Sequence, residues 1–154
     1  MTAEQSFAQV LEESGRLVYT TKGVSMRPLL RQGRDVVMIE KTGEPYKKYD
    51  TVLFLRDNGQ YVLHRILKIL DDGYWIVGDN CDRGEMVREN QILGVMTSVK
   101  RGKKIVHVND WKYRFYTHVW CDVYPLRFAL IRVRHFAYRC YRLLKTGFAD
   151  ERNK

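Results

Sequence analysis

Two residues in the first half of this 154-residue chain could together form the activated nucleophile of a hydrolase. Pro28 follows Ser25 by three residues and indicates a turn that would expose the serine hydroxyl. His64 lies inside the apolar run Tyr61 to Leu70, where a β-strand would hold its imidazole on one face. A nucleophilic serine needs such a base to take its proton, so the pair predicts acyl-transfer chemistry.

A carboxylate that orients the base could come from the loop Gly78 to Gly84, which contains Asp79 and Asp82. Each residue also has an ordinary structural interpretation. Serine in a turn, histidine in a strand and aspartate after a strand are common in proteins without catalytic roles. The residue types alone therefore do not show that the side chains meet.

Four motifs in this region resemble, in their order, those of the signal peptidase/LexA-like superfamily of serine peptidases. The resemblance covers residues 17 to 99. The matching segments are Ser25-Met26-Arg27-Pro28 with Leu29-Leu30 and Gly33-Arg34-Asp35, then Tyr49 to Phe54, then Val62 to Ile66, and finally Gly78-Asp79-Asn80 with Asp82-Arg83.

The resemblance implies a serine endopeptidase of the Ser–His subtype, because a histidine stands where the family places its base. Ser25 would be the nucleophile and His64 the general base. Asp82 is the first candidate for the orienting carboxylate and Asp79 the second. The substrate would be a peptide or protein, such as a leader-type precursor, with a small residue at the cleavage site. Hydrolysis by this route would use no cofactor and no metal.

The same resemblance places the oxyanion hole and part of the substrate-binding surface around the nucleophile. Backbone N–H groups near Val24 would stabilise the oxyanion, and Met26 and Pro28 would shape the adjoining surface. The chain departs from the family pattern at Tyr49, where a glycine is usual. The alternative function is a catalytically silent module of the same fold that binds peptides or a membrane surface.

The pattern around these motifs predicts a mainly β fold of coiled antiparallel sheets with helices at both ends. Thr2 and Gln5 have capping-box spacing, which predicts a helix over about 3–14. Alternating or continuous apolar runs between Gly, Asn and Asp breaks predict strands at 17–21, 35–39, 51–55, 61–70, 74–77, 92–99 and 104–108. Residues 1–109 would form the peptidase domain.

Residues 110–154 are expected to be a basic, aromatic, helical extension. They contain most of the 14 Lys and Arg against 4 Asp and Glu found in residues 100–154, whereas residues 1–99 contain 13 against 14. Asp110 would cap a first helix, and Pro125 and Gly147 would begin and end a second. The apolar stripe of the second helix comprises Leu126, Ala129, Leu130, Val133, Ala137, Cys140, Tyr141 and Leu144.

Three interpretations of this extension remain open. The stripe could pack on the sheet, or residues 110–145 could dock on an anionic membrane surface. Nucleic-acid binding ranks last, because no recognisable nucleic-acid fold accompanies the basic residues. Three cysteines without a CxxC pair favour a reducing compartment. We therefore expect a minimal, soluble, cytoplasmic family member without a membrane anchor, peripheral to the membrane if the extension docks.

Overall fold

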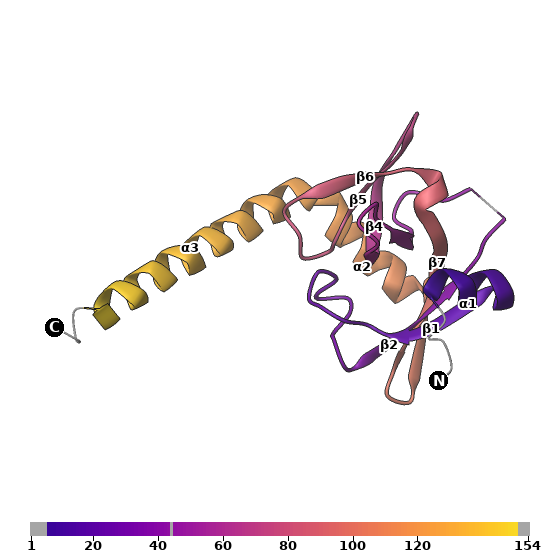
Figure 1. The fold of residues 1–154 in the computed structure, drawn as a ribbon, viewed down its shortest axis with the longest axis horizontal. Coiled ribbons are helices and arrows are strands. Elements are labelled where there is room, and N and C mark those ends of the chain that lie inside the picture. Colours follow the sequence, from indigo (N-terminus) through magenta and orange to yellow (C-terminus); the bar gives the residue numbers. More distant parts are fainter. Residues whose placement is uncertain (1–5, 44, 151–154) are drawn as a thin grey trace. The chain divides into compact units, whose positions relative to one another are not determined.

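The computed structural model describes residues 6–43 and 45–150, with the side chains of 135 and 143–150 excepted. The chain divides into two compact units, the sheet unit Met1–Asp122 and the helix unit Val123–Lys154. The sheet unit holds all the strands and the first two α-helices (Figure 1). The expected domain boundary after residue 109 stays a prediction, but the helix that follows it belongs to the same compact unit as the sheet.

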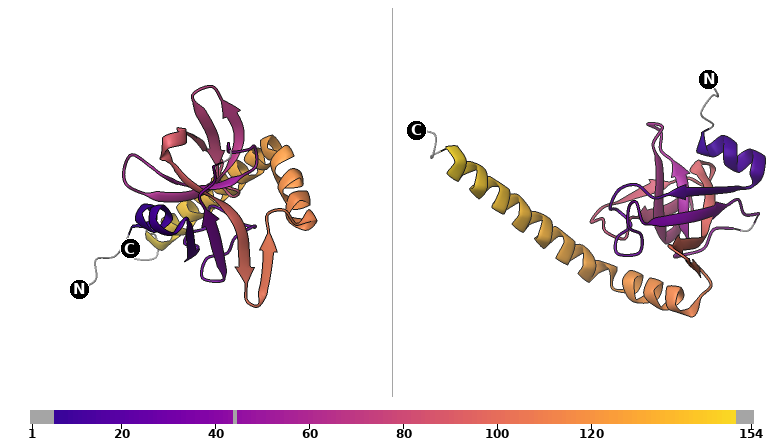
Figure 2. Two further views of the ribbon diagram at one scale, coloured as in Figure 1. Left: turned by 90° about the vertical axis from the view of Figure 1, so that its right-hand side faces the viewer. Right: turned by 90° about the horizontal axis from the view of Figure 1, so that it is seen from below.

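The fold is mainly β, as the sequence pattern predicts. Eight antiparallel strands within the described residues form one sheet in the order β1-β2-β7-β3-β4-β5-β6, with β8 paired to β7. The sheet is strongly twisted and coiled rather than flat (Figure 2). The strands are β1 (Arg16–Thr20), β2 (Asp35–Glu40), β3 (Thr51–Leu55), β4 (Tyr61–Leu70), β5 (Gly73–Val77), β6 (Gly84–Val87), β7 (Ile92–Arg101) and β8 (Lys104–His107).

Seven strands lie where the alternating pattern predicts them, within two residues at each end. β6 and the short 3₁₀-helix η1 (Glu89–Gln91) are not predicted by the sequence pattern. β6 has four residues, of which only Met86 and Val87 are apolar, so it gives almost no periodic signal. Its register is fixed by β5, where Ile76 pairs with Glu85.

The N-terminal helix α1 (Phe7–Ser14) begins at a different cap from the one expected. The Ser6 side chain accepts from the Gln9 N–H while Gln9 bonds the Ser6 N–H, which forms a capping box. The predicted cap at Thr2 and Gln5 falls outside the described residues. The helix ends as expected at Gly15, which adopts the left-handed conformation.

Two buried clusters hold the sheet unit together. The first lies under α1 and includes Leu11, Ile39 and Leu53, and the turn after β1 contributes Met26 and Leu30 to it. The second joins β3, β4, β5, β6 and β7 and comprises Val52, Phe54, Ile66, Tyr74, Ile76, Val87 and Ile92. Because the turn after β1 is anchored in the first cluster, the residues between its buried side chains are held in place.

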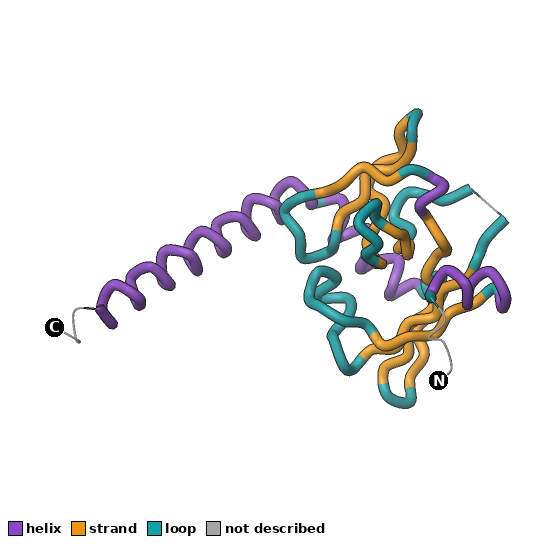
Figure 3. The backbone as a smooth tube through the Cα atoms, in the orientation of Figure 1, coloured by secondary structure: helices purple, strands orange, loops and turns teal. Residues whose placement is uncertain are grey.

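The two C-terminal helices are α2 (Trp111–Asp122) and α3 (Tyr124–Asp150), coloured purple in Figure 3. Asp110 directly precedes α2, and its carbonyl accepts the Arg114 N–H at 3.0 Å while its carboxylate accepts the His107 N–H of the preceding turn at 2.9 Å. The expected end of α3 at Gly147 is wrong, because the helix continues to Asp150. None of the described helices is long and apolar enough to cross a membrane.

Candidate functional site

Ser25 lies in the turn between β1 and β2, and it is partly exposed. The turn is held from within: the Gly23 N–H donates to Gln32 Oε1 at 3.0 Å and the Leu30 N–H to the Met26 carbonyl at 2.8 Å. Met26 and Leu30 are buried in the core below. The predicted exposed turn around Ser25 is therefore present and firmly anchored.

The loop that follows β5 is hydrogen-bonded to this turn. The Asn80 backbone N–H donates to the Ser25 carbonyl at 2.7 Å, and Asn80 Nδ2 donates to the Val24 carbonyl at 3.2 Å. The segment that resembles the family's last motif thus holds the turn that contains Ser25. Asn80 acts here as a positioning residue and not as an acid or base.

Ser25 and His64 are neighbours across Gly78. A Cβ atom at Gly78 would lie 2.8 Å from the Ser25 carbonyl oxygen, 2.9 Å from His64 Nε2 and 2.7 Å from Cys81 Sγ. Real Cβ atoms do not approach other atoms this closely, so only glycine fits at this point. The geometry brings together the two residues predicted to be nucleophile and base, and adds a thiol beside them.

The carboxylate next to His64 belongs to Glu85 of β6. Glu85 Oε1 lies 3.5 Å from His64 Nδ1. The Glu85 carboxylate also accepts hydrogen bonds from Arg56 Nε at 2.7 Å and Arg56 Nη2 at 2.6 Å. Burial raises the pKa of Glu85, but hydrogen bonds from His64 and Arg56 outweigh it and lower the pKa to about 2. Glu85 is therefore ionised at neutral pH and faces the imidazole edge opposite Nε2.

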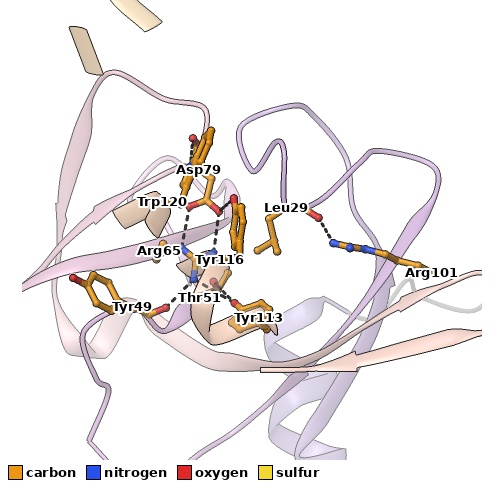
Figure 4. A network of polar contacts seen from close by, with 9 residues as sticks. All are labelled: Leu29, Tyr49, Thr51, Arg65, Asp79, Arg101, Tyr113, Tyr116 and Trp120. Atoms are coloured by element: carbon orange, nitrogen blue, oxygen red, sulfur yellow. Dashed lines mark hydrogen bonds and ion pairs between the residues drawn. The ribbon is translucent and has the colours of Figure 1, made fainter. Parts of the chain in front are cut away.

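Asp79, the second candidate for this carboxylate, has a different role. Its two oxygens accept from Arg65 Nε and Nη2, each at 2.9 Å, in a pair that is almost fully buried. Tyr116 donates to the same carboxylate at 3.1 Å, and Trp120 Nε1 donates to the Asp79 carbonyl at 2.9 Å. Figure 4 shows Asp79 enclosed by these side chains. The prediction that Asp79 orients His64 is wrong.

Asp82, the first candidate, is not the partner of His64 in the structure either. It lies two residues before β6, and no hydrogen bond or ion pair joins it to any of the described residues. Glu85 fills the position because the β5–β6 pairing places it beside Ile76 at the end of the site. The only sequence signal for Glu85 is its place just after the Gly78 to Gly84 loop.

A cavity of about 900 Å³ opens beside Ser25 and His64. Its walls come from α1, β1, the turn that contains Ser25, β3 and β4. One end is aromatic, because the Phe7 ring centroid lies 5.1 Å from those of both Tyr19 and Tyr61. Burial at this end raises the pKa of Tyr19 to about 12. The lining residues include Ser25, Met26, His64 and Cys81, whereas Val24 and Pro28 do not line it.

Tyr49 stands where the motif that this segment resembles usually has a glycine. It adopts a positive φ of 79°, which side-chain-bearing residues rarely adopt, and its carbonyl accepts from Arg65 Nη1 at 2.9 Å. Its N–H donates to the Ile66 carbonyl. The left-handed turn expected of a glycine is thus kept by a tyrosine, whose hydroxyl donates to Asp122.

Two further features bear on the chemistry of the site. The backbone N–H groups of Val24 and Ser25, which the sequence predicts to face an oxyanion, donate no hydrogen bond to any described residue. No hydrogen bond joins Ser25 Oγ to His64 in the described part of the chain. That part also contains no group of three or more His, Cys, Asp or Glu side chains able to hold a metal.

Neither a protein-family model nor a curated protein matches the chain.

Proposed function

We propose that the protein is a serine endopeptidase in which Ser25 and His64 form the catalytic pair, as the resemblance to the signal peptidase/LexA-like superfamily suggests. The observation that supports this most is the meeting of the Ser25 turn and His64 Nε2 across Gly78, at the edge of a large cavity. A chance pairing of turn serine and strand histidine would not be expected to have a carboxylate behind the imidazole.

In this mechanism Ser25 Oγ attacks the peptide carbonyl while His64 Nε2 takes the hydroxyl proton. Glu85 accepts from Nδ1 and stabilises the imidazolium that forms. The N–H groups of Val24 and Ser25 stabilise the oxyanion. His64 then passes the proton to the leaving amine, and water hydrolyses the acyl-enzyme by the same route in reverse.

The cavity suggests how a peptide would bind. β1 is a terminal strand of the sheet, and Thr20 and Thr21 at its end line the cavity, so an extended peptide could pair with its outer edge. The aromatic end formed by Phe7, Tyr19 and Tyr61 would accept an apolar side chain of the substrate. The cysteine usage favours a cytoplasmic precursor as substrate.

A second candidate function is a peptide-binding module of the same fold without turnover. The missing hydrogen bond between Ser25 Oγ and His64 favours it. Catalytic hydrogen bonds often tighten only when substrate binds, so this absence does not remove the catalytic proposal.

Mass spectrometry of a diverse peptide library would test the proposal. Wild type should cleave bonds that Ser25→Ala and His64→Ala leave intact, and the flanking residues would define the substrate preference. Cys81→Ala is the matched control, because its thiol lies at the same point of the site. Cleavage that survives Ser25→Ala and disappears with Cys81→Ala would contradict the serine mechanism, and binding without cleavage would favour the module.

A further inference from the structure

The helix α3 separates apolar from basic side chains along its length. At 100° per residue, one arc of about 140° contains no charged residue. The members of this apolar arc are Leu126, Ala129, Leu130, Val133, Phe136, Ala137, Cys140 and Tyr141. Leu144 continues the arc in sequence, but its side chain lies outside the described ones.

The apolar arc is exposed. Leu126, Leu130 and Val133 are each 62–65% exposed, and Phe136 is 71% exposed. The described part of the helix unit, up to residue 150, is a single helix and contains no other element that could cover its apolar arc. A row of large exposed apolar side chains on one helix face marks an interaction surface.

The basic residues lie on the opposite side of the helix, together with Phe128, Ile131 and Tyr138. Arg132, Arg134, Arg139 and Arg142 are exposed there and Lys145 follows them in sequence, whereas Arg127 is buried. Residues 123–149 include no Asp or Glu. Arg132 and Arg134 fall at the two borders of the apolar arc, where long side chains can keep their charges in water while their stems lie on an apolar surface. The partner must therefore have an anionic surface and an apolar layer beneath that surface.

We propose that α3 docks in the plane of an anionic lipid bilayer, with its apolar arc in the acyl boundary and its exposed arginines among the headgroups. An in-plane helix requires this combination of an uncharged arc and basic borders. A second copy of the chain fits less well, because two such helices would bring like charges together without an acidic residue to pair with them. Nucleic acid would leave the apolar arc uncovered.

The preceding helix has similar surface chemistry within the sheet unit. Trp111, Phe115 and Val119 follow one another at intervals of four residues on α2, and they are 51–72% exposed. Tryptophan and phenylalanine are typical of the membrane–water interface. Docking by α3 is independent of whether the cavity beside Ser25 hydrolyses peptides.

Co-sedimentation of the full chain with phosphatidylcholine vesicles, with and without phosphatidylglycerol, tests the proposal. Binding should require phosphatidylglycerol. Leu130→Gln should weaken partitioning about tenfold, because a buried apolar side chain is lost. Tyr138→Gln, at an equally exposed position on the basic side, is the matched control and should change vesicle partitioning by less than about twofold. Arg139→Gln should weaken vesicle partitioning about fivefold.

Four outcomes would overturn the proposal. These are no binding to either vesicle, equal binding to both, equal losses for Leu130→Gln and Tyr138→Gln, and concentration-dependent self-association without vesicle binding. Both glutamine variants change exposed positions and keep a good helix former, so circular dichroism should show unchanged helix content.

Discussion

At the residue scale, the site depends on two neighbours in β4 whose side chains point to opposite faces. His64 faces the cavity and Glu85, and Arg65 faces the buried Asp79. Asp79 therefore pairs with Arg65, whereas Glu85 lies against His64 and also pairs with Arg56. The sequence shows the acidic residues but not this division, because it follows from strand alternation and from the pairing of β5 with β6. Ser25 and His64 could be predicted from the motifs, and Glu85 could not.

Asp79→Ala should destabilise the fold far more than Asp82→Ala. Removal of Asp79 leaves the Arg65 guanidinium buried without its carboxylate, which costs about 3–5 kcal/mol. Asp82→Ala should change the free energy of unfolding by less than about 0.5 kcal/mol. Urea unfolding of both variants measures the difference, and similar values for the two would contradict the assignment of Asp79 as structural.

Glu85→Gln should lower the free energy of unfolding at neutral pH, and this difference from wild type should disappear in acid. The pKa of Glu85 falls from its usual 4.5 to about 2 in the folded protein, so its ionised form stabilises the fold above pH 4.5. That contribution disappears as the pH falls from 4.5 toward 2. Urea unfolding at several pH values should show wild type and Glu85→Gln converging over this range. A difference that stays constant to pH 2 would show that the ionised carboxylate is not responsible.

At the element scale, three segments distant in sequence assemble the site: the turn after β1, the strand β4 and the loop between β5 and β6. The strands could be predicted because apolar alternation and Gly, Asn and Asp breaks mark them clearly. β6 could not, because four residues with two apolar side chains resemble a loop. The end of α3 was missed because the helical pattern continues past Gly147, where a glycine costs only about 1 kcal/mol.

Gly78→Ala should push the Ser25 turn away from His64 and Cys81. Its Cβ would lie within 3 Å of a backbone oxygen, an imidazole nitrogen and a sulfur, so the Ser25 turn must shift. We expect loss of peptide cleavage and destabilisation of about 1–3 kcal/mol. Gly43→Ala is the matched control, because a Cβ there meets nothing within 4 Å. Full activity in Gly78→Ala would contradict the close approach on which the site depends.

At the scale of the whole molecule, the candidate site and the long basic helix belong to different units. The sheet unit contains the cavity, and the helix unit contains a long basic helix with an uncovered apolar arc. The composition predicts this division, since most of the basic excess lies in the last third of the chain. Which surface the helix contacts could not be read from composition, because packing, lipid and nucleic acid all fit a basic amphipathic pattern.

Salt should affect the two units differently. Raising NaCl from about 50 mM to about 500 mM screens the arginines of α3 and should release the protein from anionic vesicles. Cleavage of a short uncharged peptide should remain within about twofold, because the pair Ser25 and His64 lies in the other unit. Parallel loss of vesicle binding and cleavage would contradict this separation.

The most direct test of the central claim is labelling with a fluorophosphonate, which reacts with an activated serine by forming a phosphorus–oxygen bond and releasing fluoride. Intact-mass and peptide mapping should find one adduct on Ser25 in wild type and none in His64→Ala, because an unactivated serine does not react. No adduct on Ser25, an adduct on Cys81 instead, or equal labelling of His64→Ala would contradict the Ser25–His64 mechanism.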